Sequence, residues 1–260
     1  MTFPQIDPVF LKLGPLEFRW YGLMYILSFL AGYAIIRYGA KQRGLGFTAD
    51  DVADLVFNVA IGIILGGRLG YALFYNFSWY LAHPLKIFAV WEGGMSFHGG
   101  FLGAIVAGLL FSRKKGIPAL ALADVCFLTA PVGLFLGRIG NFINGELYGR
   151  VTDAPWGVVF PGGGPLPRHP SQLYEALLEG PVTLAILWLV FRADCRRGSL
   201  LWGFIALYGC FRFAVEFFRE PDAHLGFVIG TFSMGQLLSL PMVLLGVGML
   251  LFRRREGRAG

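Results

Sequence analysis

Residues 119–150 read ALALADVCFLTAPVGLFLGRIGNFINGELYGR, an apolar run that ends in a polar, glycine-rich segment. An α-helix rises about 1.5 Å per residue, so roughly 20 apolar residues cross the roughly 30 Å of hydrocarbon in a bilayer. Arg138, Asn141 and Glu146 stand where this run ends. A charged side chain near hydrocarbon costs about 3 kcal/mol on insertion scales, and such residues usually have a function. The stretch therefore predicts a membrane-spanning helix with a functional site at its end.

The same apolar pattern recurs along the whole chain. Hydrophobic residues make up 56% of the 260 residues and charged residues only 15%, a composition typical of membrane proteins. The three cysteines, an odd number, indicate no disulfide framework. We predict an all-α polytopic membrane protein in which residues 1–260 form a single integral membrane domain. About seven transmembrane helices are expected, at 20–36, 52–75, 96–112, 119–140, 173–191, 198–218 and 231–252.

The basic residues predict the orientation of these helices. They cluster after the first, third, fifth and seventh apolar segments, so the net charge of +6 is a topology signal and does not indicate nucleic-acid binding. By the positive-inside rule, the N-terminus lies outside and the C-terminus lies in the cytoplasm. The polar segments 76–95 and 141–170 then form a small outward-facing (periplasmic) cap of short strands or turns. The clusters are Arg37, Lys41 and Arg43; Arg113, Lys114 and Lys115; Arg192, Arg196 and Arg197; and Arg253, Arg254, Arg255 and Arg258.

With this orientation, the ionisable residues inside the predicted helices gather in the outer half of the membrane. Tyr208, Arg212 and Glu216 are spaced four residues apart and share one helix face. His98 precedes two glycines, where a ligand or another backbone can approach closely. Ion pairs that hold helices together are the structural alternative to a reaction site. The other members of this set are Arg68, Arg138 and Glu175.

Two of these arginines favour an anionic ligand. Guanidinium groups bind phosphate oxygens in bidentate fashion, so Arg138 and Arg212 from different helices can hold one phosphate from two sides. Two unpaired arginines would otherwise repel each other at low dielectric. An anionic lipid headgroup is the expected ligand. The chain carries no zinc-ligand spacing and no nucleotide-binding loop, so no metal and no cofactor are expected.

The polar segment resembles the signature of a known family. The run Gly137-Arg138-x-Gly140-Asn141-Phe142-x-Asn144-x-Glu146-x-x-Gly149 is similar, at every fixed position, to that of the bacterial prolipoprotein diacylglyceryl transferase family. Further motifs extend the resemblance from the first predicted helix almost to the last. They are Arg19-Trp20-Tyr21-Gly22, Ser96-Phe97-His98-Gly99-Gly100, Arg168-His169-Pro170-Ser171-Gln172-Leu173-Tyr174-Glu175 and Tyr208-Gly209-x-x-Arg212-Phe213-x-x-Glu216-Phe217-Phe218-Arg219-Glu220-Pro221-Asp222.

The resemblance implies a multi-pass enzyme of the bacterial cytoplasmic (inner) membrane. It implies that the diacylglyceryl group of phosphatidylglycerol is transferred to the thiol of the signal-peptide cysteine of prolipoproteins. A thioether forms and glycerol phosphate is released, as the first step of lipoprotein maturation. The implied partners are phosphatidylglycerol, prolipoprotein signal peptides and membrane lipids.

Roles for individual residues follow from this reaction. The thiol must lose its proton before it attacks, because thiolate is the nucleophile. His98 is the first candidate for the base, since imidazole ordinarily accepts a proton near neutral pH, and Tyr208 is its rival. Arg138 and Arg212 are expected to stabilise the departing phosphate. Tyr21 and Asn141 are expected to bind headgroup or glyceryl oxygens, and Glu146 and Glu216 to orient the arginines. The expected substrate-binding residues are Tyr21, Arg138, Asn141, Asn144, Glu146, Gly149, Arg212 and Glu216.

A transporter or flippase for an anionic lipid is the alternative function. It too would need arginines within the membrane and a path for headgroups. Such a protein should carry polar residues through the full depth of the bilayer, whereas this chain concentrates them in the predicted outer half.

Overall fold

The computed structural model describes residues 1–193, 195–220 and 227–256. Pro221 and Asp222 of the last motif, and Arg258 of the last basic cluster, lie outside the described residues. The chain divides into two compact units. The first combines Met1–Ile35 with Asp124–Gly260, and the second is Ile36–Ala123.

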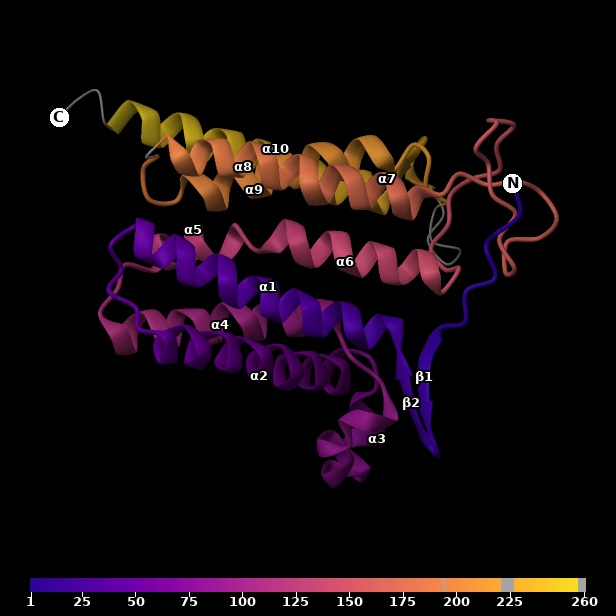
Figure 1. The fold of residues 1–260 in the computed structure, drawn as a ribbon, viewed down its shortest axis with the longest axis horizontal. Coiled ribbons are helices and arrows are strands. Elements are labelled where there is room, and N and C mark those ends of the chain that lie inside the picture. The colour runs from indigo at the N-terminus through magenta and orange to yellow at the C-terminus, as the bar shows by residue number, and fades with distance from the viewer. Residues whose placement is uncertain (194, 221–226, 257–260) are drawn as a thin grey trace. The chain divides into compact units, whose positions relative to one another are not determined.

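Helices dominate the first unit, and several of them run side by side (Figure 1). The core of this unit consists of apolar side chains from two helices, among them Leu187 and Phe204, and of Leu128 in the turn between two others. Burial of such side chains stabilises the packing of neighbouring helices. The helices are α1 (Trp20–Gln42), which continues into the second unit, α5 (Ala119–Phe127), which begins in that unit, α6 (Ala130–Ile143), α7 (Ser171–Leu177), the π-helical turn η3 (Leu178–Val182), α8 (Thr183–Arg192), α9 (Ser199–Val215) and α10 (Met234–Glu256).

A buried carboxylate fixes the start of α9. Asp124 accepts hydrogen bonds from the backbone N–H groups of Gly198, Leu200 and Leu201, at 2.5, 2.9 and 3.0 Å. These N–H groups have no partners within the helix, and a carboxylate there also complements the helix dipole. Gly198 adopts a φ of 87°, which L side chains rarely adopt, and this lets the chain turn into α9.

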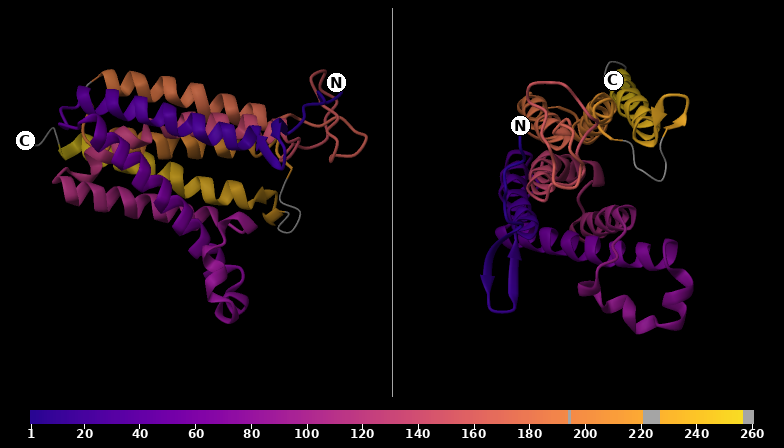
Figure 2. Two further views of the ribbon diagram at one scale, coloured as in Figure 1. Left: turned by 60° about the horizontal axis from the view of Figure 1, so that its bottom comes forward. Right: turned by 90° about the vertical axis from the view of Figure 1, so that its right-hand side faces the viewer.

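Two short hairpins accompany the helices of the first unit. Strand β1 (Val9–Leu13) pairs antiparallel with β2 (Leu16–Arg19), and β3 (Phe227–Ile229) pairs antiparallel with β4 (Phe232–Ser233). The first hairpin turns at Gly14, whose φ is 59°, and projects away from helices α6 to α10 (Figure 2). The chain is therefore mostly helical, as predicted, but it also contains two short hairpins that the all-α prediction did not include.

The second unit is built on a close pair of helices, α2 (Ala49–Phe74) and α4 (Phe97–Lys115). Glycines allow this contact, since a Cβ atom added at Gly103 would lie 1.9 Å from the carbonyl oxygen of Gly62. A Cβ at Gly66 would lie 2.3 Å from the carbonyl oxygen of Gly99. Small residues at such spacing let helix backbones approach closely in membranes.

The polar segment between α2 and α4 differs from the prediction. It was expected to form strands or turns, but it folds into α3 (Phe77–Ala82) and two 3-10 turns, η1 (Pro84–Phe88) and η2 (Val90–Glu92). A strand needs a neighbouring strand to accept and donate its backbone hydrogen bonds, whereas a helical turn forms these hydrogen bonds within itself.

Each of the seven predicted spans contains helix in the structure, but these helices differ in length and hydropathy. Within the described residues, five helices are long and apolar enough to cross a bilayer. Of the two other predicted spans, α9 is apolar but has only 17 residues, and α4 has 19 residues. The protein is thus a multi-pass helical membrane protein. The five helices are Trp20–Gln42, Ala49–Phe74, Ala119–Ile143, Ser171–Arg192 and Met234–Phe252.

Candidate active site

Helix α6 carries Arg138 near its C-terminal end, beside the N-terminal residues of α1. A Cβ atom at Gly140 would lie 2.9 Å from Cδ2 of Tyr21, so only glycine lets the tyrosine ring pack on the backbone here. Tyr21 also interacts electrostatically with Arg138 and Glu146. The structure therefore gathers three predicted site residues, Tyr21, Arg138 and Glu146, in one part of the first unit.

A single carboxylate links three arginines. Glu175, in α7, is completely buried. Its Oε2 lies 3.0 Å from Nε of Arg138, and its Oε1 lies 2.5 Å from Nη1 of Arg212 and 3.1 Å from Nη1 of Arg219. The contact to Arg138 is an ion pair without hydrogen-bond geometry. The two arginines predicted to hold a phosphate are thus joined through Glu175.

Arg138 and Arg212 differ in how the protein holds them. Among the described residues, the ion pairs of Arg138 run through Nε, to Glu175 and to Glu179. Arg212 instead uses both terminal nitrogens, since Nη2 lies 2.7 Å from Oε2 of Glu216. The end-on edge of Arg138, formed by Nη1 and Nη2, therefore points away from these carboxylates. This edge matches the geometry of phosphate oxygens.

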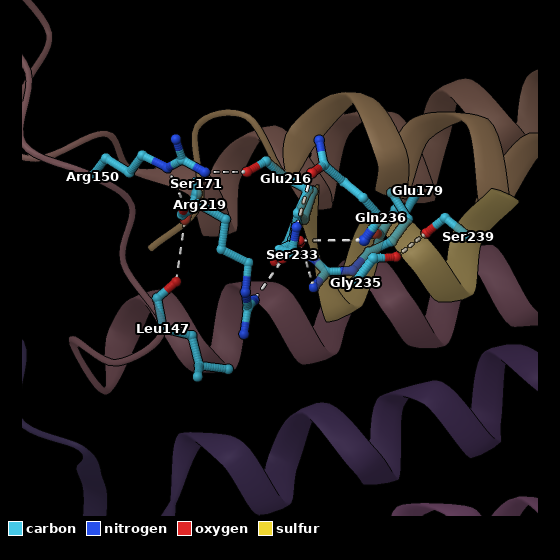
Figure 3. Close-up of polar contacts among 12 residues, drawn as sticks. Leu147, Arg150, Ser171, Glu179, Glu216, Arg219, Ser233, Gly235, Gln236 and Ser239 are labelled. Atoms are coloured by element: carbon cyan, nitrogen blue, oxygen red, sulfur yellow. Dashed lines mark hydrogen bonds and ion pairs between the residues drawn. The ribbon is translucent and has the colours of Figure 1, made fainter. Parts of the chain in front are cut away.

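Glu216 is itself fixed by the start of α10. The hydroxyl of Ser233 donates to Oε1 of Glu216 over 2.8 Å, and a Cβ atom at Gly235 would lie 2.7 Å from the carboxylate. Figure 3 shows Glu216, Ser233, Gly235 and Gln236 gathered where α9 and α10 meet. Glu216 forms an ion pair with Arg212, and its role in orienting this arginine stays a prediction. Tyr208, one turn before Arg212, interacts electrostatically with both Arg138 and Arg212.

Glu146 has different partners from those predicted. Its Oε1 accepts hydrogen bonds from the amide groups of Asn141, at 2.9 Å, and Asn144, at 3.2 Å. Glu146 was expected to orient the arginines, but the chain turns just after α6 and brings the carboxylate back to these asparagines. The structure thus joins three of the predicted binding residues into one group.

Gly149 packs closely against two other segments of the chain, one at Phe218 and one at His169. A Cβ atom there would lie 2.3 Å from the carbonyl oxygen of Phe218 and 2.8 Å from Cβ of His169, so no other residue fits. Nearby, the guanidinium of Arg150 donates to the backbone oxygens of Arg219, at 2.9 Å, and Glu216, at 3.3 Å (Figure 3). Gly149 and Arg150 therefore tie the polar segment 141–170 to the end of α9.

A hydrogen-bonded chain in the same segment involves His169. The indole of Trp156 donates to the hydroxyl of Tyr174 at 2.7 Å, and this hydroxyl lies 3.1 Å from Nδ1 of His169. The tyrosine proton can then be donated to Nδ1, which requires an unprotonated nitrogen. Burial lowers the pKa of His169 below its ordinary value, although Asp153 acts in the opposite direction. The lowered pKa favours the neutral form of the His169 imidazole.

His98 belongs to the second unit, in the first turn of α4. Ser96 caps this helix through a hydrogen bond from the N–H of Gly99, at 3.2 Å, and its own N–H donates to the carbonyl oxygen of Gly67 at 2.8 Å. Arg68 is buried and donates to loop carbonyl oxygens, among them those of Ile87 at 2.9 Å and Lys86 at 2.6 Å. The side chain of His98 is exposed.

Several residues of the network were missing from the predicted site. Glu179 and Arg219 were not assigned a role, and Glu175 was considered only as a structural ion-pair partner. The four-residue spacing of Glu175 and Glu179 was a usable signal, because it places both on one helix face. Among the described residues, no group of three or more His, Cys, Asp and Glu side chains is arranged to hold a metal ion. None of the three cysteines, all of which the structure describes, forms a disulfide bond.

The fold and the buried network define a multi-pass membrane protein with an arginine-rich polar site among its helices. Residues 8–252 match the sequence model of the prolipoprotein diacylglyceryl transferase family, so the chain belongs to that family. The match covers the arginine network and the signature around Arg138.

Curated relatives match over nearly the whole chain. A phosphatidylglycerol–prolipoprotein diacylglyceryl transferase of Geobacter sulfurreducens is 67% identical over 259 residues, which is 99% of this chain and 100% of the relative. Proteins of the same name from Vibrio atlanticus and Nitratidesulfovibrio vulgaris are 52% and 51% identical, covering 99% and 96% of this chain and 94% and 95% of their own lengths. These matches favour a transferase over a transporter or flippase.

Proposed function

We propose that this protein transfers the diacylglyceryl group of phosphatidylglycerol to the cysteine thiol of a prolipoprotein signal peptide. The observation that carries the proposal is the pair of arginines joined by Glu175, in a chain 67% identical over its length to a transferase of that name. Phosphatidylglycerol bears one phosphodiester charge, which the guanidinium groups can bind. Membrane lipids surround the protein and supply this substrate.

The reaction exchanges one bond for another. The thiolate sulfur attacks the glyceryl carbon that carries the phosphate ester, and a carbon–sulfur bond forms as the carbon–oxygen bond breaks. The electron pair of the broken bond leaves with the oxygen of glycerol phosphate, and the thiol proton passes to a base. Negative charge therefore grows on the leaving group, and fixed positive charge beside it lowers the barrier.

Arg138 is the principal phosphate ligand in this proposal, and Arg212 assists it. The carboxylates contact Nε of Arg138, so both Nη groups can donate to phosphate oxygens. Arg212 has one carboxylate at each Nη group and retains one N–H on each. Charge on the leaving oxygen then meets a guanidinium that Glu175 and Glu179 hold in place.

His98 is the proposed base. Its exposed ring, at the start of a helix capped by Ser96, can accept a proton from a thiol near the membrane surface. Tyr208 is the alternative base. It lies close enough to Arg138 and Arg212 for electrostatic interaction, which would stabilise a phenolate.

The remaining predicted residues take supporting roles. Tyr21 and Asn141 bind headgroup or glyceryl oxygens, while Glu146, which also accepts a hydrogen bond from Asn144, fixes the amide of Asn141. Gly149 gives the polar segment its close path past Phe218. Glu216 holds Arg212 in orientation.

We also propose the arrangement of the protein in the cytoplasmic (inner) membrane. Seven helices span the bilayer as one integral membrane domain, with the N-terminus outside and the C-terminus in the cytoplasm. Segments 76–95 and 141–170 form the outward-facing cap. The basic clusters after alternate helices support this orientation.

The transferase and flippase functions can be separated in proteoliposomes. Purified protein is reconstituted with labelled phosphatidylglycerol, and both lipid movement between leaflets and glycerol phosphate release are measured, with and without a cysteine-containing signal peptide. A transferase releases glycerol phosphate only when the peptide is present. Movement of lipid between leaflets, without any peptide-dependent release, would contradict the proposal.

A further inference from the structure

Glu179 is a second buried carboxylate beside Arg138, in addition to Glu175. It lies in the π-helical turn Leu178–Val182, between α7 and α8, and is completely buried. The next residue, Gly180, leaves helical geometry with φ of −91° and ψ of −109°. A Cβ atom there would lie 2.7 Å from Cβ of Phe135, so the turn packs tightly against α6, which carries Arg138. Single π-helical turns occur frequently at functional sites.

Two carboxylates share one edge of Arg138. Oε2 of Glu175 lies 3.0 Å from Nε of Arg138, and Oε2 of Glu179 lies 3.5 Å from the same nitrogen. Glu175 alone is sufficient to pair with this nitrogen. Within the described part of the chain, neither carboxylate oxygen of Glu179 accepts a hydrogen bond, although both are buried. Burying a carboxylate with so few partners is costly, so a structural role alone does not account for Glu179.

The charges of the network explain what the second carboxylate adds. Three arginines, at positions 138, 212 and 219, are linked by ion pairs to three carboxylates, at positions 175, 179 and 216. If all six are ionised, their charges balance. An incoming phosphate is attracted by Arg138 and, when Glu179 is ionised, repelled by Glu179. Such repulsion is strong where the dielectric constant is low.

We propose that Glu179 is a positioning residue that holds the Nε edge of Arg138 and, through its charge, limits how tightly Arg138 retains the glycerol phosphate product. The inference rests on the proposed role of Arg138 as the phosphate ligand. An enzyme needs this limit because binding the phosphate too tightly in the product state slows turnover without stabilising the transition state.

The direction in which the inhibition constant of glycerol phosphate changes distinguishes this role from a structural one. Glu179→Gln keeps the size of the side chain and an acceptor for Nε but removes the charge. The inhibition constant of glycerol phosphate should fall on the order of tenfold, because one opposing charge is gone. Damage to the site would instead weaken product binding and raise the constant. Glu179→Asp keeps the charge but withdraws it from Arg138, so an intermediate fall of about twofold is expected.

The test is product inhibition of the full-length protein, assayed with phosphatidylglycerol and a cysteine-containing signal peptide. The matched control is Glu17→Gln, which removes an exposed carboxylate in the β2 strand and should leave the constant unchanged. An inhibition constant in Glu179→Gln equal to or above the wild-type value overturns the proposal. Should that variant not fold, an unchanged or raised constant in Glu179→Asp overturns it.

A further variant distinguishes failure of this inference from failure of the proposed phosphate site. Arg138→Lys should raise the inhibition constant about tenfold, because lysine cannot bind phosphate in bidentate fashion. If Arg138→Lys leaves the constant unchanged, the phosphate role of Arg138 is wrong, and the inference about Glu179 falls with it. If Arg138→Lys raises the constant while Glu179→Gln does not lower it, only the inference about Glu179 is wrong.

Discussion

The carboxylate of Glu175 lies 3.0 Å from Nε of Arg138 and is completely buried between helices. The same carboxylate contacts Arg212 and Arg219, so its removal would leave three guanidinium groups without their shared partner. Glu175 is therefore central both to the packing of the first unit and to the proposed phosphate site.

Replacing Glu175 by alanine should be among the most destabilising changes in this chain. Without Glu175, Arg138 and Arg212 keep Glu179 and Glu216, but the positive charge of the network is no longer balanced, and uncompensated buried charge costs about 3 kcal/mol or more. We expect Glu175→Ala to lower the free energy of unfolding by at least that amount, as measured by thermal or chemical denaturation in detergent. Glu220→Ala is the control, since Glu220 pairs with Arg168 at an exposed position, and such pairs contribute about 1 kcal/mol or less. Equal destabilisation by the two variants would disprove the central role of Glu175.

The turnover of two variants distinguishes His98 from Tyr208 as the candidate base. His98→Gln removes the proposed proton acceptor and should reduce kcat on the order of 100-fold or more. Tyr208→Phe removes only a hydroxyl and should reduce kcat less than about tenfold. The measurement is the rate of peptide modification at saturating lipid. Near-normal turnover of His98→Gln, together with a large loss in Tyr208→Phe, would transfer the role of base to Tyr208.

The glycine contacts between α2 and α4 predict a contrast within one helix. A Cβ at Gly103 would lie 1.9 Å from the carbonyl oxygen of Gly62, whereas a Cβ at Gly108 would meet nothing within 4 Å. Gly103→Ala should therefore destabilise the protein by about 2 kcal/mol, since overpacking forces the backbones apart. Gly108→Ala should be neutral or slightly stabilising, because alanine favours helix. Equal unfolding temperatures of the two variants would contradict the close contact.

The hydrogen-bonded chain at His169 predicts a dependence of stability on pH. Burial lowers the pKa of His169 in the folded protein, so below about pH 6.5 the unfolded chain binds more protons at this residue. The contribution of His169 to stability should thus be constant above about pH 6.5. It should decrease as the pH falls from there toward the pKa of the folded protein. His169→Gln should show a smaller loss of Tm between pH 7.5 and 5.5 than the wild type. An identical loss in both proteins would show that His169 does not titrate in this way.

The sequence predicted the helical spans and the family more completely than the contacts of the site. Apolar periodicity and length locate α6 and α9, and the four-residue spacing of Tyr208, Arg212 and Glu216 predicts their common face. The link through Glu175 depends on how a third helix packs between them, which no spacing along the chain encodes.

The strands were missed for a different reason. The hairpin at 9–19 turns at Gly14, next to Pro15, a pair of residues typical of turns. The residues on either side of this turn are largely apolar, so their pattern is hard to distinguish from that of the helix that begins at Trp20. Similarly, the partners of Glu146 follow from a local chain reversal after Ile143, and a search for opposite charges overlooks the neighbouring asparagines.

The most direct measurement of the central claim is the mass of a synthetic signal peptide incubated with purified protein and phosphatidylglycerol. We predict a mass increase equal to one diacylglyceryl group on the cysteine, with an equal amount of glycerol phosphate released and no modification of a peptide that carries serine in place of cysteine. Arg138→Ala should reduce this modification on the order of 100-fold or more, because the guanidinium that stabilises leaving-group charge is lost. An unmodified peptide after incubation with folded wild-type protein would contradict the account.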